Sequence, residues 1–253
     1  HALQRLGRIH NRRAAWRTIE AAHDAGLDSF NIDLMHGLPD QTEAAGLADI
    51  ETAIALEPPH LSWYQLTIEP NTAFAFSPPA LPADATLDQI GENGRDRLVA
   101  AGYGQYEISA FARPGHECEH NLNYWRFGDY LGIGAGAHGK ITLPAENRVE
   151  RRVRSRHPNR YLELAGSPAN IEGHDIPRRE LPFEFMLNAL RLTGGFPVSL
   201  FQERTGMPIA VVSTTLRGLE DDGLIEWDIQ DIRPTERGHR FLNDVLGRFL
   251  PDD

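Results

Sequence analysis

Two kinds of apolar pattern alternate along the first 111 residues of the chain. Apolar residues recur at helical spacing in three segments, at 12–25, 40–57 (with Asp40 as the expected cap) and 86–101. Short apolar runs predict buried strands at 29–35, 61–68 and 103–111. This alternation is typical of a parallel βαβ sheet, whose ligands gather at the carboxyl ends of the strands. We therefore predict three adjacent parallel strands, with Asp33 and Thr67 opening on the same edge.

The pattern changes from about residue 181. Three helices are predicted there, at 183–192, 199–205 and 209–221. Two short strands at 224–228 and 230–234 and a closing helix at 236–249 follow. Helices combined with a two-stranded wing indicate a winged-helix-like domain. The sequence thus predicts an α/β domain over 1–143, an Arg- and Pro-rich linker over 144–180, and a winged-helix-like domain over 181–253.

Charge argues against a nucleic-acid partner. The 253 residues carry a formal charge of −11, and residues 181–253 hold seven arginines, no lysine and twelve acidic residues. A DNA-binding surface needs a basic face, so the winged helix is interpreted as a packing or lid module. The sequence also has a single cysteine, Cys118, and no signal-peptide pattern, which favours a cytoplasmic location.

Three short stretches carry candidate chemistry, and each has a purely structural alternative. His116, Cys118 and His120 stand at alternate positions, a spacing that suits a zinc site poorly. Either one of them serves as an axial ligand of haem iron, or the stretch is a polar loop without a ligand. The glycine-rich run at 132–139 lacks nucleotide-binding signatures, and serves either close ligand approach or packing. The arginine-rich run at 148–160 would hold propionate-like carboxylates or form a solvated linker.

Longer motifs resemble a known family. The strings NIDLMHGLPDQT (31–42), PPHLSWYQLTIEPNT (58–72) and CEHNLNYWRFGDYLGIGAGAHGK (118–140), with the winged-helix tail, are similar to the radical SAM haem chaperones, the HemW family. These proteins are related to the oxygen-independent coproporphyrinogen III dehydrogenase. The resemblance implies the later half of a partial (β/α)₆ radical SAM barrel followed by the family's C-terminal domain.

The resemblance also implies cofactors and site residues. It implies a [4Fe–4S] cluster, whose cysteine motif is absent here, and S-adenosylmethionine (SAM). Since the chain starts at His1 rather than Met, we expect that motif to lie upstream, with no metal site in this chain. Three residues match positions that meet SAM in the related dehydrogenase: Arg8, Asp33 and Thr67. HNLNYW (120–125) resembles the H-N-x-x-Y-W signature linked to haem, which implies four haem-side residues: His120, Asn121, Tyr124 and Trp125.

The implied function is that of a haem chaperone. Haem would be its cargo, delivered to an acceptor protein, with a membrane-bound acceptor included among the candidates. The alternative is a radical SAM enzyme that decarboxylates coproporphyrinogen, against which HNLNYW argues. Whether the protein is an enzyme at all is left open by the resemblance.

Overall fold

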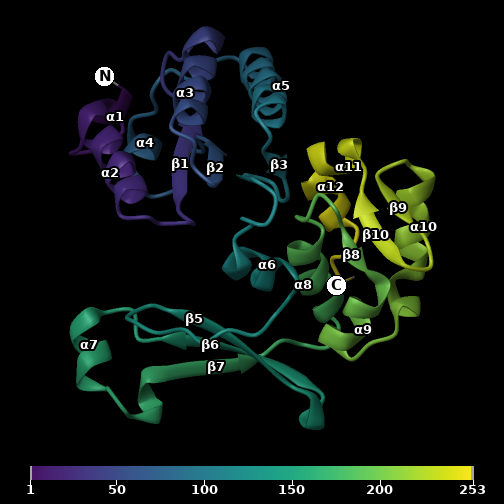
Figure 1. Cartoon of the computed structure of the whole chain (residues 1–253). Helices are drawn as coiled ribbons and strands as arrows, with labels where there is room; N and C mark the ends of the chain where they lie inside the picture. Colours follow the sequence, from purple (N-terminus) through teal and green to yellow (C-terminus); the bar gives the residue numbers. More distant parts are fainter. Residues whose placement is uncertain (1, 252–253) are drawn as a thin grey trace. The chain divides into compact units, whose positions relative to one another are not determined.

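The computed structural model describes residues 2–251, and the chain divides into two compact units, His1–Cys118 and Glu119–Asp253 (Figure 1). Each unit has its own hydrophobic core. Within the described residues, no helix is both long and apolar enough to cross a membrane.

The first unit is built on a four-stranded sheet with the order β1-β2-β4-β3. Its strands are β1 (Asn31–His36), β2 (His60–Gln65), β3 (Gly104–Gln105) and β4 (Ala110–Ala112). The pairing of β1 with β2 is parallel, as predicted, and places Asp33 opposite Ser62. The prediction of one parallel strand over 103–111 is wrong, because β4 runs antiparallel to β2 and lies between β2 and β3.

A turn inside the run at 103–111 causes this difference. The N–H of Tyr106 donates to the carbonyl of Ala110, and the Glu107 carboxylate accepts from the N–H of Ser109. These polar contacts reverse the chain where the apolar pattern alone suggests continuity. The strand that follows, β4, therefore enters the sheet beside β2 as the return arm of a hairpin.

Helices cover one face of this sheet. The unit contains α1 (Ala2–Arg5), α2 (Arg12–Asp24), α3 (Glu43–Ala55), α4 (Ala73–Phe76) and α5 (Asp84–Ala100). The helix expected from Asp40 is capped instead by Thr42, whose hydroxyl accepts from the N–H of Ala45, while Asp40 has a left-handed φ of 58°. A Cβ on Gly94 of α5 would lie 2.1 Å from the Trp63 ring, so only glycine allows this helix its close approach.

The second unit begins with α6 (Glu119–Trp125) and an antiparallel sheet. This sheet contains β5 (His138–Leu143), β6 (Arg148–Arg154) and β7 (Ile171–Asp175), and it is joined by α7 (Pro158–Glu163) and two 3₁₀ helices, η1 (Pro144–Glu146) and η2 (Pro168–Asn170). The segment predicted as a linker therefore forms regular structure. Its strand signal was hidden because arginines occupy most of β6, where they pair with carboxylates such as Glu150 and Asp175.

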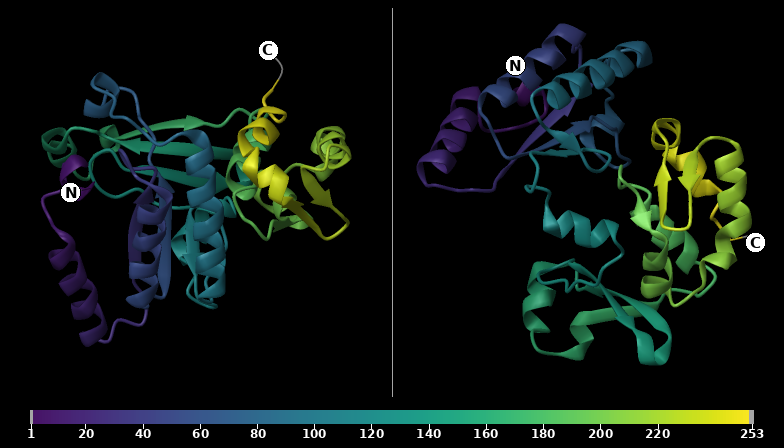
Figure 2. Two further views of the ribbon diagram at one scale, coloured as in Figure 1. Left: turned by 90° about the horizontal axis from the view of Figure 1, so that it is seen from above. Right: turned by 45° about the vertical axis from the view of Figure 1, so that its right-hand side comes forward.

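The C-terminal part has the winged-helix-like arrangement that the pattern predicts (Figure 2). Its helices are α8 (Leu181–Ala189), α9 (Val198–Thr205), η3 (Ile209–Val212), α10 (Ser213–Asp221), α11 (Glu236–Arg240) and α12 (Leu242–Gly247). Its antiparallel sheet, with the order β8-β10-β9, contains β8 (Phe196–Pro197), β9 (Ile225–Trp227) and β10 (Asp231–Pro234). Phe185 is fully buried at its centre, in edge-on contact with Phe127, Phe196 and Phe201.

Candidate functional site

Polar side chains line one face of the paired strands β1 and β2. Because side chains alternate along a strand, Ile32 and Leu34 pack against the core and leave Asn31 and Asp33 on the opposite face. The Asn31 side-chain amide donates to Asp33 at 2.8 Å, and its oxygen accepts from Ser62 at 3.0 Å. The same oxygen lies 2.7 Å from Nδ1 of His60.

These contacts fix the tautomer of His60. Since the Asn31 side-chain oxygen is only an acceptor, Nδ1 of His60 must donate a hydrogen bond to it. Nε2 of His60 then accepts a hydrogen bond from the Tyr106 hydroxyl at 2.8 Å. The Tyr106 oxygen in turn accepts the N–H of Cys118 at 3.3 Å. Burial lowers the pKa of His60, in keeping with this neutral form. Both ring nitrogens of His60 are thus hydrogen-bonded within the protein.

The three residues matched to SAM contacts lie in different settings. Asp33 is exposed on the polar strand face, three residues before the end of β1, which is about 10 Å at the usual rise per residue. Thr67 lies two residues beyond β2 and donates to Glu69 at 3.2 Å. Arg8 is exposed between α1 and α2. Among residues 2–251, no hydrogen bond or ion pair joins these three side chains, and their role in SAM binding stays a prediction.

Aromatic rings gather at α6 in the second unit. His120 and Tyr124 are one helical turn apart, with ring centroids 4.6 Å apart in an edge-on arrangement. Tyr124 also lies 4.3 Å from the ring of Tyr130, and burial together with this neighbour raises the pKa of Tyr124. The His120 ring is exposed, and within the described part of the chain its nitrogens have no hydrogen-bond partner.

The other two residues of the predicted haem set lie differently. Trp125 is half-buried, with the guanidinium of Arg191 4.3 Å above its ring. Asn121 is half-buried on the intervening side of the helix. The structure therefore brings His120 and Tyr124 together and places Trp125 against the C-terminal part of its unit.

The segment after α6 holds the helix in place. The side-chain amide of Asn123 donates to the backbone carbonyl of Asp129 at 3.0 Å, and the backbone carbonyl of Asn123 accepts from the N–H of Gly128 at 2.7 Å. A Cβ on Gly128 would collide with Asn123 at 2.0 Å, so this position requires glycine. Phe127 takes a left-handed φ of 52° and is buried in the core of the second unit.

Lys140, the single lysine of the chain, completes this anchor. It is 1% exposed, and its ammonium donates to Asp129 at 2.8 Å and lies 4.2 Å from the centroid of the Phe127 ring. Burial lowers the pKa of Lys140. Although burial works against it, hydrogen bonds from Lys140 and Thr142 lower the pKa of Asp129. The loop that carries Tyr130 is thereby fixed to β5.

The alternating ligands at 116–120 do not form a metal site. His120 belongs to α6, so the extended segment that would place all three on one face is not present. Within residues 2–251, no group of three or more His, Cys, Asp or Glu residues is arranged to hold a metal ion. An iron–sulfur cubane needs three or four thiolates, and the sequence has one cysteine, so these residues do not fit that cluster.

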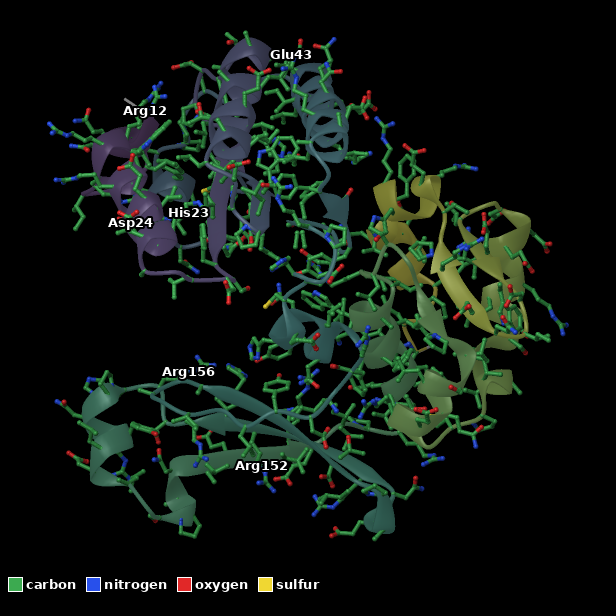
Figure 3. The ribbon with its side chains drawn as sticks, in the orientation of Figure 1. Arg12, His23, Asp24, Glu43, Arg152 and Arg156 are labelled. Atoms are coloured by element: carbon green, nitrogen blue, oxygen red, sulfur yellow. The ribbon has the colours of Figure 1, made fainter. Side chains whose placement is uncertain are left out.

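Carboxylates already engage most of the arginine-rich run. Arg148 pairs with Glu146 and Asp175, and Arg151 donates to Glu184 at 2.6 Å and to the Tyr130 hydroxyl at 3.1 Å. Arg152, labelled in Figure 3, pairs with Glu150 at 2.8 Å. Arg156, also labelled there, is exposed. The run therefore braces its own sheet first, and Arg156 is its clearest candidate for an external anion.

The glycine-rich run at 132–139 is built for close packing. A Cβ on Gly132 would lie 2.3 Å from the carbonyl oxygen of His138, and a Cβ on Gly139 would lie 3.2 Å from the carbonyl oxygen of Tyr130. Gly134 and Gly136 have left-handed φ values of 110° and 72°. Of the two interpretations of this run, its geometry supports packing.

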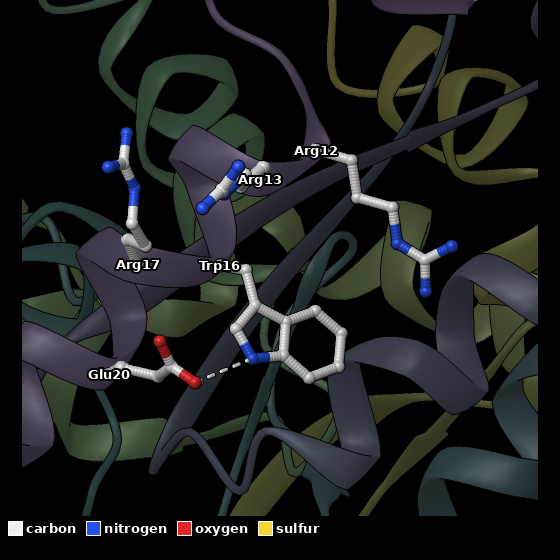
Figure 4. Close-up of a pocket in the computed structure, with 5 residues that line it drawn as sticks. All are labelled: Arg12, Arg13, Trp16, Arg17 and Glu20. Atoms are coloured by element: carbon white, nitrogen blue, oxygen red, sulfur yellow. Dashed lines mark hydrogen bonds between the residues drawn. The ribbon is translucent and has the colours of Figure 1, made fainter.

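A shallow pocket lies on α2 in the first unit (Figure 4). Arg12, Arg13 and Arg17 surround Trp16, whose indole N–H donates to Glu20 at 3.0 Å. The pocket is open, and all of its lining residues belong to a single helix. It therefore does not compete with the aromatic cluster on α6 as a ligand site.

Sequence reasoning missed several members of both sites. Asn31, His60 and Ser62 are polar residues at alternate positions of predicted strands, and this two-residue period was the available signal. Tyr130 is an aromatic residue close to the motif in sequence, but its contact with Tyr124 depends on the turn at 126–129. The buried Lys140 gave no signal beyond being the single lysine.

Comparison with known proteins agrees with this architecture. The HemN C-terminal domain family matches residues 176–241. A solved structure, the coproporphyrinogen III oxidase HemN of Escherichia coli, described as a radical SAM enzyme, superposes with a TM-score of 0.76 over 98% of this chain and 61% of its own, at 19% identity. This likeness establishes the fold.

Sequence relatives are closer. The protein named heme chaperone HemW of Haemophilus influenzae is 47% identical over 251 residues, and that of Escherichia coli K12 is 48% identical over 255. The HemW of Bacillus subtilis is 33% identical. The chain is matched over 98–99% of its length, and spans 64% of the length of the first relative and 65% of the second.

The fold and the domain match define the class, an α/β protein with the fold of HemN and a HemN C-terminal domain, in agreement with the predicted fold class. Within that class, the chain is similar in sequence to the proteins named heme chaperone HemW.

Proposed function

We propose that this chain binds haem at the aromatic face of α6, as part of a haem chaperone that passes haem to an acceptor protein. The observation that carries the proposal is the exposed His120 imidazole beside Tyr124 and Tyr130, on a chain 47–48% identical to proteins named heme chaperone. An imidazole with free nitrogens can ligate haem iron, and the adjacent rings offer flat apolar contact to the macrocycle.

The anchoring of α6 supports this proposal physically. The helix is tied to its own unit through Asn123, Phe127 and the pair formed by Asp129 and Lys140, so its exposed face is presented without a folding step. A preorganised site loses less conformational entropy on binding. Release to an acceptor would then require that a ligand of the acceptor replace the exposed His120 imidazole on the haem iron.

The cofactors of the whole protein belong to the same proposal. SAM would lie against the polar face of β1 and β2, where the exposed Asp33 carboxylate can accept hydrogen bonds from its hydroxyl or amino groups. The [4Fe–4S] cluster does not fit the residues of this chain, and no step here depends on it. An acceptor protein, whether membrane-bound or not, is likewise a proposal drawn from the relatives' names.

A haem titration tests the proposal. The chain is titrated with ferric haem and followed through its Soret absorbance, alongside His120→Ala, Cys118→Ser and a control, His157→Ala, at an exposed histidine of the same unit. We expect near-stoichiometric binding by the unsubstituted chain and a loss of affinity on the order of 100-fold in His120→Ala, since the iron ligand is removed. Cys118→Ser and His157→Ala should match the unsubstituted chain.

Two results contradict the proposal. Unchanged affinity and spectrum in His120→Ala would remove the site from α6. A change of spectrum in Cys118→Ser alone would make the thiolate the ligand instead of the imidazole.

A further inference from the structure

The Trp125 side chain makes a contact of its own, away from His120 and Tyr124. Its indole ring lies beneath the guanidinium of Arg191, which follows the last residues of α8, at 4.3 Å from carbon to ring centroid. The backbone carbonyl of Arg191 also accepts from Nε2 of His239 in α11 at 3.2 Å. The ring therefore rests on a residue that is connected to two helices of the C-terminal part.

Helical geometry separates Trp125 from the exposed face. Five residues at 100° each place it about 140° around α6 from His120, whereas Tyr124 is only about 40° away. The two aromatic residues of HNLNYW consequently serve different sides of one short helix. His120 and Tyr124 face outward, and Trp125 docks the helix.

The ring, not its N–H group, makes this contact. Nε1 of Trp125 is buried and has no hydrogen-bond partner within residues 2–251. A buried donor without a partner is destabilising, so the indole is retained here for its π face. Stacking of a guanidinium on an indole is among the stronger cation–π arrangements.

We propose that Trp125 is a positioning residue, which sets the direction of the His120 imidazole by stacking α6 on Arg191. The proposal rests on the proposed haem-binding function and reassigns Trp125 from a haem-contacting residue to one that acts through the helix. Because α6 has only seven residues, a displacement of its last residue, Trp125, also displaces His120. Trp125 thus affects haem only as long as His120 is present.

Four variants of the full chain test this, each titrated with ferric haem and checked by circular dichroism. Trp125→Phe keeps a ring on Arg191 and should bind within about threefold of the unsubstituted chain. Trp125→Ala should bind about tenfold more weakly, in line with a desolvated cation–π contact. Arg191→Met, which leaves the indole in place, should weaken binding similarly. Trp227→Ala, at another half-buried tryptophan of this unit, should lower stability without changing haem affinity.

A double variant gives a measurement that would not change if Trp125 had a merely structural role. On the His120→Ala background, Trp125→Ala should produce no further loss of haem affinity. An additional loss there, or a Trp125→Phe variant as weak as Trp125→Ala, would show direct contact of the indole with haem and overturn the inference. Full affinity in Trp125→Ala and Arg191→Met would overturn it as well.

The two proposals fail in different ways. If the unsubstituted chain binds no haem, the proposed function fails and this inference fails with it. If His120→Ala weakens binding but the substitutions at Trp125 and Arg191 do not, the inference alone fails.

Discussion

Two histidines, one in each unit, show how differently the same side chain is used. His60 on β2 is 4% exposed, and both of its ring nitrogens are hydrogen-bonded, to Asn31 and to Tyr106. His120 on α6 is exposed, and within residues 2–251 its ring makes one ring contact, edge-on with Tyr124. A buried imidazole whose two nitrogens are already used stabilises the fold, whereas an exposed one keeps its lone pair for a ligand.

The surroundings of the two residues explain the contrast. His60 and Ser62 of β2 are buried, so their polar atoms must find partners within the protein. α6 is a single short helix anchored from its other side, which leaves His120 outside any network. Stability and ligand binding should therefore respond oppositely to substitution at these two positions.

The largest effect on stability is expected from His60→Ala. The substitution leaves a cavity, removes two hydrogen bonds and deprives the Tyr106 hydroxyl of its acceptor, at a cost of about 3 kcal/mol in the free energy of unfolding. Urea denaturation followed by circular dichroism measures this loss, with His10→Ala, at an exposed position, as the control. Hydrogen exchange should locate the loss in β1 and β2. A loss below about 1 kcal/mol would contradict the network described for His60.

The fold of the first unit was predictable where the hydrophobic periodicity and the turn residues of the sequence agree. β1, β2, α2 and α5 fall close to their predicted ranges, because their apolar stripes are continuous and glycines follow the ends of β1, α2 and α5. The hairpin of β3 and β4 was not predictable, since the turn at 106–109 depends on contacts of Glu107 and Tyr106 that no local pattern shows. The sheet of β5, β6 and β7 was missed because paired charges occupy its strands.

A third histidine extends the comparison to the dependence of stability on pH. His36, 7% exposed beside the Trp63 ring, has a buried Nδ1 without a partner within residues 2–251. Burial lowers the pKa of His36 to about 4. Its pKa in the unfolded chain is near 6.5, so between these values the unfolded state binds more protons and stability falls as pH falls.

Linkage gives the size of this effect. Between pH 7.5 and pH 5 the chain should lose about 2 kcal/mol of stability through His36, and the lowered pKa of His60 acts in the same direction. His36→Phe removes the titrating group and should reduce the loss by that amount. Urea denaturation of both proteins at the two pH values checks this. Equal losses in the two proteins would show that His36 does not titrate in this range.

The candidate site was predictable only in part, for a physical reason. The motif HNLNYW falls on α6, and the contact of His120 with Tyr124 follows from helical spacing once a helix is assumed. The separate position of Trp125 depends on Arg191, which is 66 residues away in sequence and gives no signal near the motif. Long-range contacts of this kind decide which residues of a motif face outward.

The smallest stability effect is expected at His120 itself. Its ring is exposed and makes a single edge contact with Tyr124, so His120→Ala removes little apolar burial and no hydrogen bond of the described structure. Alanine also has the higher helix propensity, which offsets part of the lost contact. We expect a change within about 0.5 kcal/mol in the free energy of unfolding without haem, measured by urea denaturation. The same variant should show, with haem present, a loss of the ligand-induced stabilisation that the unsubstituted chain gains, because haem bound only to the folded state shifts the unfolding equilibrium. A variant destabilised by several kcal/mol without haem would mean that His120 supports the fold as His60 does, and the contrast between the two histidines would be lost.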